Sequence, residues 1–88
     1  MRLKVIAPKA HETRRGLSWS GVLVVNDQPV ARFEHAGDGG CLHIDWKPGL
    51  NHESIDAALV ALAAGETFEP IDTAIGDLWD TAMRKGAA

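Results

Sequence analysis

The chain contains a single cysteine, Cys41. An intramolecular disulfide is therefore excluded, which fits a reducing compartment. The longest apolar run, Ala57 to Ala64, is far shorter than the roughly 20 residues that span a bilayer. The N-terminal segment MRLKVIAPKAHE carries charges within its apolar stretch and lacks the core of a signal peptide. We therefore expect a cytoplasmic protein without a membrane segment.

Internal repeats, linkers and low-complexity segments are also missing. The 88 residues are the length of one small domain, and an apolar fraction of 45% argues against disorder. A chain of this size buries only roughly 60–65% of its unfolded surface, which supports one two-layer core. The sequence predicts a single domain over residues 1–88.

The net charge of −3 hides a difference between the two parts of the chain. Residues 1–50 carry seven Lys or Arg against five Asp or Glu, a net charge of +2, whereas residues 51–88 carry two against seven, a net charge of −5. One interpretation is a solvated helical surface that keeps the protein soluble. The other is a negative surface that docks on a basic partner or imitates nucleic acid.

Alternating apolar residues predict strands in the first half, over 2–7, 17–25, 30–35 and 41–46, with a polar loop over 8–16 and a turn over 26–29. Gly21 interrupts the second strand, which indicates a bulge or a close backbone approach. The side chains expected to face the core are Leu17, Trp19, Leu23, Val25, Ala31, Phe33, Leu42, Ile44 and Trp46.

In the second half of the chain, the apolar residues are spaced as in amphipathic helices. Residues 52–65 have apolar positions at i, i+3, i+4 and i+7, with Asn51 as the expected N-cap and Gly65 as the stop. A second helix is expected to start near Pro70 and to bury one stripe, composed of Ile71, Ile75, Leu78, Trp79, Ala82 and Met83.

These elements predict an α+β fold, an antiparallel β-meander of about four strands with two C-terminal helices packed on one face, in the order ββββαα. The other face of the sheet would stay uncovered, which makes it a candidate surface for a partner or for a homodimer. The residues expected on it are Ser18, Ser20, Val22, Val24, Arg32, Glu34, His43 and Asp45.

A glycine-rich stretch stands between the third and fourth predicted strands: Gly37, Asp38, Gly39 and Gly40. A phosphate-binding loop needs a lysine after its glycines and a helix behind it, since the helix N-terminus donates to the phosphate. Here Cys41 and a strand follow. The stretch therefore reads as a hairpin connection, or as a tip that lets another molecule approach its backbone closely.

Cys41, His43 and His35 raise the question of metal or thiol chemistry. Zinc sites show paired ligands at short spacings, whereas Cys41 and His43 lie roughly 6.5–7 Å apart along one strand. Cys41, His43 and Asp45 side by side on an open strand would not converge as a catalytic set requires. We predict no catalytic residue, metal ligand or cofactor.

A basic cluster lies in the segment that contains Lys9, His11, Arg14 and Arg15. An ordinary solvated loop explains it. The alternative is a nucleotide or nucleic-acid binding module that uses Arg14, Arg15 and Arg32 together with the glycine tip.

The segment GLSWSGVLVVNDQPVARFEHAGDGGCLHIDW, residues 16–46, resembles a loosely defined group of small phage and prophage proteins. The shared pattern is a glycine-led strand, a short turn, a V-A-x-[FV]-x strand and a D-G-x-G-G tip. The resemblance implies a phage context, in which small acidic proteins often inhibit host defence by binding, as anti-CRISPR proteins do. It assigns no role to individual residues.

The leading hypothesis is therefore a non-enzymatic binding protein, a phage-derived inhibitor that occludes a surface of a bacterial defence complex of the CRISPR type. The expected contact residues are Glu66, Glu69, Asp77 and Asp80. The glycine tip, residues 37–40, is a second expected contact.

Overall fold

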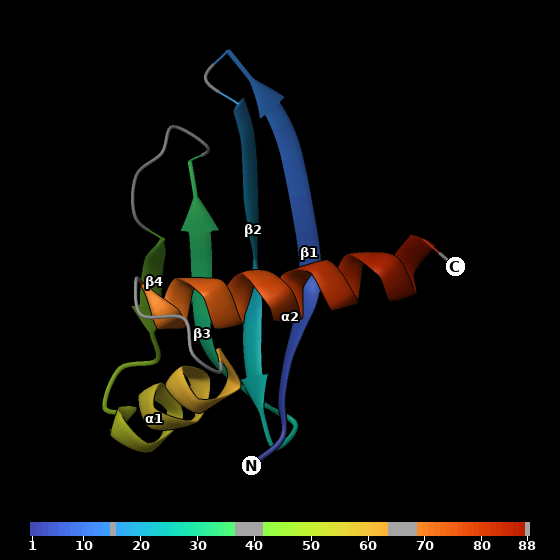
Figure 1. Cartoon of the computed structure of the whole chain (residues 1–88). Helices are drawn as coiled ribbons and strands as arrows, with labels where there is room; N and C mark the ends of the chain where they lie inside the picture. The colour runs from blue at the N-terminus through green and yellow to red at the C-terminus, as the bar shows by residue number, and fades with distance from the viewer. Residues whose placement is uncertain (15, 37–41, 64–68, 88) are drawn as a thin grey trace.

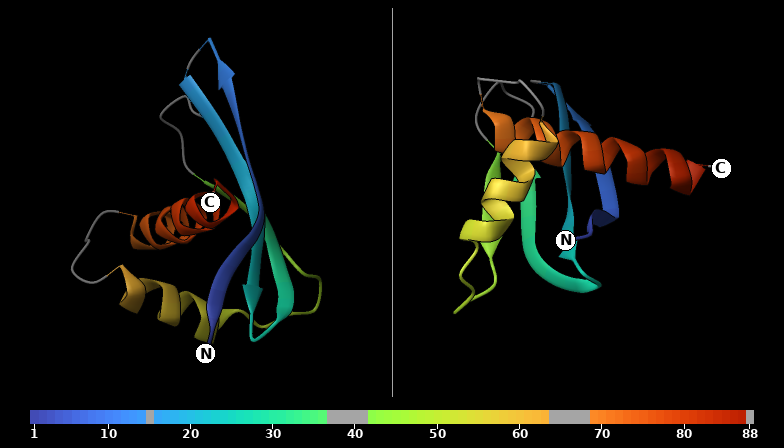
Figure 2. Two further views of the ribbon diagram at one scale, coloured as in Figure 1. Left: turned by 90° about the vertical axis from the view of Figure 1, so that its right-hand side faces the viewer. Right: turned by 60° about the horizontal axis from the view of Figure 1, so that its bottom comes forward.

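The computed structural model describes residues 1–14, 16–36, 42–63 and 69–87 (Figure 1). Its elements are β1 (Leu3–Thr13), β2 (Gly16–Val25), β3 (Gln28–His35), β4 (His43–Trp46), α1 (Glu53–Leu62) and α2 (Pro70–Ala87). The four strands form one antiparallel sheet in the order β1-β2-β3-β4. Both helices lie on the same face of that sheet (Figure 2). The predicted ββββαα fold is confirmed.

The first strand is longer than the sequence predicts, and the expected loop over 8–16 is wrong. β1 continues to Thr13, which pairs with Gly16 of β2. A register shift between Ile6 and Lys9 absorbs Pro8, and Ala7 takes a φ of 50° there. This bulge lies on an edge strand, where a residue without an N–H is tolerated.

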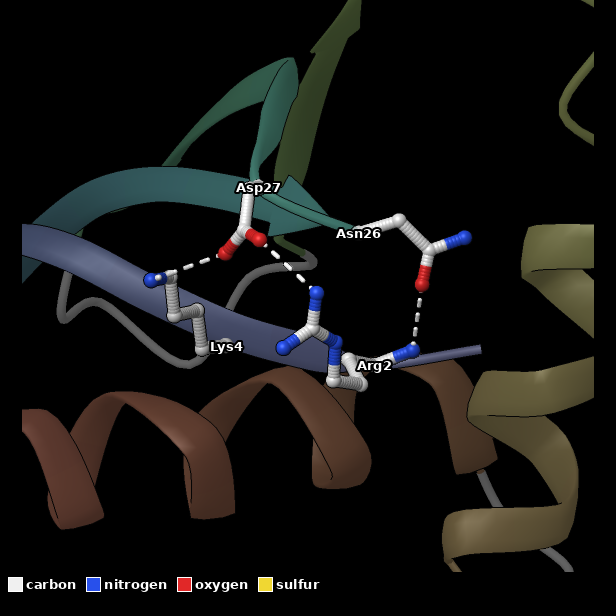
Figure 3. Close-up of polar contacts among 4 residues, drawn as sticks. All are labelled: Arg2, Lys4, Asn26 and Asp27. Atoms are coloured by element: carbon white, nitrogen blue, oxygen red, sulfur yellow. Dashed lines mark hydrogen bonds and ion pairs between the residues drawn. The ribbon is translucent and has the colours of Figure 1, made fainter.

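The turn between β2 and β3 is a two-residue loop in which Asn26 and Asp27 have φ values of 50° and 68°. Two positive φ values are typical of a type I′ hairpin. The predicted turn is confirmed at Asn26 and Asp27, but Gln28 and Pro29, which were also expected in it, belong to β3. Asn26 Oδ1 accepts a hydrogen bond of 2.8 Å from the Arg2 backbone N–H, and the Asp27 carboxylate lies 2.8 Å from Arg2 and 3.5 Å from Lys4 (Figure 3). These exposed contacts tie the chain start to the turn but add little stability.

The core lies between the sheet and the helices, and its fully buried side chains include Leu23, Leu59 and Ile75. The predicted inward positions on β2, β3 and β4 are buried or pack against this core, with one exception. Leu17 is 47% exposed, because it pairs near the end of the β1–β2 hairpin, which extends beyond α2 (Figure 1).

One residue expected on the open face is instead buried. Val24 is only 3% exposed, and its neighbours Leu23 and Val25 are buried as well. A second register shift, between Leu23 and Val24, sets Val24 opposite Pro29 of β3, and Lys4 of β1 stands opposite it on the other side.

Both helices begin close to their predicted starts. The N-cap of α1 is His52, one residue after the predicted Asn51, while Asn51 Oδ1 accepts a hydrogen bond of 3.1 Å from the Glu53 N–H. The expected stop at Gly65 lies outside the described residues. α2 starts at Pro70 as predicted, and the carboxylate of Asp72 in its first turn accepts a 3.1 Å hydrogen bond from the backbone N–H of Leu42. That bond fixes the start of α2 beside the segment that leads into β4.

Candidate functional site

The two parts of the chain that differ in net charge form two different layers of the fold. Residues 1–50 contain all four strands and residues 51–88 contain both helices. We call these the sheet layer, with a sequence net charge of +2, and the helix layer, with −5. Because both helices lie on one face of the sheet (Figure 2), the acidic residues carried by α1 and α2 lie on that side of the molecule.

The predicted acidic contacts on α2 share an exposed stripe. Asp77 and Asp80 are exposed, three residues apart on α2, whereas Ala74 and Ile75 on the same helix are buried. Asp80 forms an i,i+4 ion pair of 2.8 Å with Arg84, so its charge is partly balanced. Glu69 is exposed immediately before the helix. Glu66 lies outside the described residues.

The predicted glycine tip, Gly37 to Gly40, also lies outside the described residues, as does Cys41. Its flanks are described: β3 ends at His35 before it, and β4 begins at His43 after it. The two strands are antiparallel neighbours, with Phe33 opposite Ile44. A strand and not a helix follows the stretch, so the helix N-terminus of a phosphate-binding loop is missing at residues 43–46.

The helix-free face of the sheet is polar at its centre. Arg32 stands opposite Asp45, and Glu34 stands opposite His43; all four are exposed, as the alternation predicted. A hollow of about 720 Å³ covers this region, and a second of about 490 Å³ adjoins it. Val22, Arg32 and Asp45 line both hollows, which makes them one continuous depression.

Two residues of β1 belong to this face but were missed by the sequence reasoning. Ile6 stands opposite Val22 and is 43% exposed, and Lys9 stands opposite Ser20. The reasoning ended the first strand before Lys9, and only the pairing with β2 places these side chains beside Arg32 and Glu34. The apolar character of Ile6 was the sequence feature that could have indicated its place on this face.

The three tryptophans pack against the core, as predicted: Trp19, Trp46 and Trp79. The indole N–H of Trp79 donates a 2.9 Å hydrogen bond to the Ser20 carbonyl, and the Trp79 ring lies 5.3 Å from that of Trp19. His35 stacks on Trp19 at 5.2 Å, so this histidine packs against an aromatic ring.

The rings of Trp46 and His52 form a similar stack. His52 lies over Trp46 at 4.1 Å, and its Nδ1 is 2.8 Å from the Asp56 carboxylate. Across the described ranges, no three side chains of the metal-ligating types form a group that could hold an ion.

The predicted nucleic-acid contacts are not brought together. Arg14 is exposed in the β1–β2 turn, whereas Arg32 stands opposite Val22 in the middle of the sheet. Six strand positions separate Val22 from Gly16, which is about 20 Å at the rise of a strand. Arg15 lies outside the described residues.

No family model, curated protein or solved structure matches this chain. Within the described part of the chain, neither helix has the length and apolarity needed to cross a membrane.

Proposed function

We propose that the chain is a non-enzymatic binding protein whose acidic helix layer docks on a basic surface of a protein partner. The partner class we propose is a bacterial defence complex of the CRISPR type, which the chain inhibits by occlusion. The observation that carries the proposal is the separation of charge between layers, with a sequence net charge of −5 on the helical side against +2 on the sheet side.

A one-sided charge of this kind has a physical consequence for binding. Complementary potentials raise the association rate and disfavour partners of the wrong sign. The stripe on α2 is also held rigidly, since Ala74 and Ile75 are fully buried and Trp79 is hydrogen-bonded to the sheet. A rigid surface loses little conformational entropy on binding, which favours affinity.

The choice of partner class comes from the resemblance of residues 16–46 to small phage proteins. That resemblance covers β2, β3 and β4 with the segments between them. It supports a context, and the contact surface is argued from charge alone. Occlusion needs only a surface of matching charge and shape, which a small two-layer domain can provide.

The test compares matched charge reversals on the two layers. Asp77→Lys changes an exposed acid on the helix layer, and Glu12→Lys changes an exposed acid on the sheet layer; each moves the net charge from −3 to −1. Tagged wild-type and variant proteins are used to capture partners from a nuclease-treated lysate of bacteria that carry CRISPR complexes. Captured proteins are quantified by mass spectrometry.

We expect Asp77→Lys to weaken capture of the defence complex about tenfold, equivalent to about 1.4 kcal/mol, and Glu12→Lys to leave it within about twofold. Equal losses for both variants, or a larger loss for Glu12→Lys, would contradict docking through the helix layer. Capture that is found in a parallel untreated lysate but is lost after nuclease treatment would instead favour the nucleic-acid alternative.

A further inference from the structure

The helix-free face of the sheet carries exposed side chains that the proposed function does not use. Its side chains form two cross-strand rows, fixed by the sheet register. The first row contains Lys9, Ser20, Glu34 and His43. The second row contains Ile6, Val22, Arg32 and Asp45. These eight residues are called the outer face below.

Charges on the outer face are balanced. Lys9 and Arg32 are basic, Glu34 and Asp45 are acidic, and all four are exposed. None of the four forms an ion pair within the described residues, although Arg32 stands directly opposite Asp45 on the neighbouring strand. A balanced face attracts neither a polyanion nor a strongly basic surface. It is matched best by a face that offers the same two signs in the opposite places.

We infer that the outer face is the interface of a homodimer, in which it packs on the outer face of a second copy. A two-fold axis that crosses the strands between the two rows would lay each row over the other row of the second copy. Arg32 would then face Glu34 of the second copy, and Glu34 would face its Arg32, as an isologous interface requires. All four strands of one copy would overlie all four of the other, an aligned packing that is ordinary for two sheets.

The uncharged members of the rows fit the same arrangement. Val22 would lie over Ser20 of the second copy, at the centre of the interface. Ile6, which is 43% exposed, would lie over the aliphatic stem of Lys9. Side chains of the second copy would fill the depression of about 720 Å³ and its neighbour of about 490 Å³.

The charge of the helix layer also favours this face over the other. Dimerisation through the helix layers would bring two surfaces with a sequence net charge of −5 each together. Dimerisation through the outer faces places them on opposite sides of the dimer, where their repulsion is smallest. The helix layer also stays exposed for a partner, so the inference does not depend on the proposed function.

The area of the outer face indicates how tightly the two copies should bind. Four strands about 4.8 Å apart and about 20 Å of paired length cover roughly 400 Å² in projection. A stable interface buries about 800 Å² of accessible surface on each partner. We therefore expect a weak dimer that dissociates in the micromolar range.

Sedimentation velocity over a range of micromolar concentrations, with native mass spectrometry, tests the inference. The wild-type protein should shift from monomer to dimer as its concentration rises. Arg32→Glu and Glu34→Arg should each raise the dimer dissociation constant at least tenfold, because each opposes like charges twice in the dimer. Circular dichroism verifies that both variants are folded.

A mixture of these two variants supplies the decisive measurement. In a mixed dimer, Glu at position 32 of one copy meets Arg at position 34 of the other, and the remaining wild-type pair is intact. The mixture should therefore recover a heterodimer, detected by mass, although neither variant dimerises alone. Pairing within one chain cannot produce this recovery, because each chain keeps its own like charges.

A matched pair of apolar substitutions completes the test. Ile6→Lys, on the outer face, should weaken the dimer, and Leu62→Lys, on α1 at a similar exposure of 46%, should not. A wild-type protein that stays monomeric throughout would overturn the inference. So would a dimer that tolerates both charge reversals, or variants whose mixture does not recover the heterodimer.

Discussion

Gly21 is a position at which adding a single methyl group should destabilise the protein. A Cβ added there would lie 2.9 Å from Phe33 Cζ and 2.9 Å from Val5 Cγ1, with the Ile6 carbonyl at 3.4 Å. Neither side chain can withdraw easily, because Phe33 is 3% exposed and Val5 is 6% exposed. Gly21→Ala therefore forces the core apart on two sides, from β1 and from β3.

The magnitude follows from two opposing terms. Overpacking a closed core costs about 1–3 kcal/mol. Alanine recovers about 0.5–1 kcal/mol, because glycine loses more backbone entropy on folding. The net loss is about 1–2 kcal/mol. For a domain of 88 residues this lowers the melting temperature by about 5–15 °C.

Thermal and urea unfolding followed by circular dichroism measure this effect, with Gly76→Ala as the matched control. Gly76 lies inside α2, where an added Cβ would meet only Trp19 Cη2 at an ordinary 3.8 Å. Gly76→Ala should therefore stabilise the protein by up to about 1 kcal/mol. If Gly21→Ala proved neutral or stabilising, the close approach of Val5 and Phe33 to the β2 backbone would be refuted.

Three further predictions concern contacts that join distant parts of the chain. Asp72→Ala should destabilise the protein by about 1 kcal/mol and speed hydrogen exchange at the Leu42 amide, whereas an unchanged exchange rate would refute the 3.1 Å bond between them. Trp79→Phe should cost about 1–3 kcal/mol in urea unfolding, because it removes the hydrogen bond to Ser20 and part of a ring; a neutral result would contradict that anchoring role. Asp27→Ala should lower stability by about 1–2 kcal/mol and Asp27→Gly should not, since the cost comes from a φ of 68°; equal losses in thermal unfolding would assign it to the exposed ion pairs instead.

Patterns of neighbouring residues in the sequence were sufficient to predict several elements of the fold. The alternation at Arg32, Phe33 and Glu34 was enough to assign inward and outward sides, since burial on one face forces a period of two. Pro70 was enough to place the start of α2, because proline suits the first position of a helix. Asn26 and Asp27 similarly indicated a turn, because both residue types favour turns. Their positive φ values came from the structure.

The candidate site was only partly predictable. The exposed acids on α2 and the polar residues of the open sheet face were identified, but Ile6 and Lys9 were not added to that face. Their place depends on the pairing of β1 with β2, in which Ile6 meets Val22 and Lys9 meets Ser20. No local pattern reports the partner of a strand.

The sequence by itself therefore determined the order of the elements, most of their buried sides and the unequal charge of the two halves, because each depends on neighbours along the chain. Only the tertiary structure decided that β1 continues past Pro8, that Val24 is buried, and that the two charges come to lie on opposite layers. The physical reason is that bulges, strand partners and the face covered by the helices are set by contacts between residues far apart in sequence, such as Trp79 with Ser20 and Asp72 with Leu42.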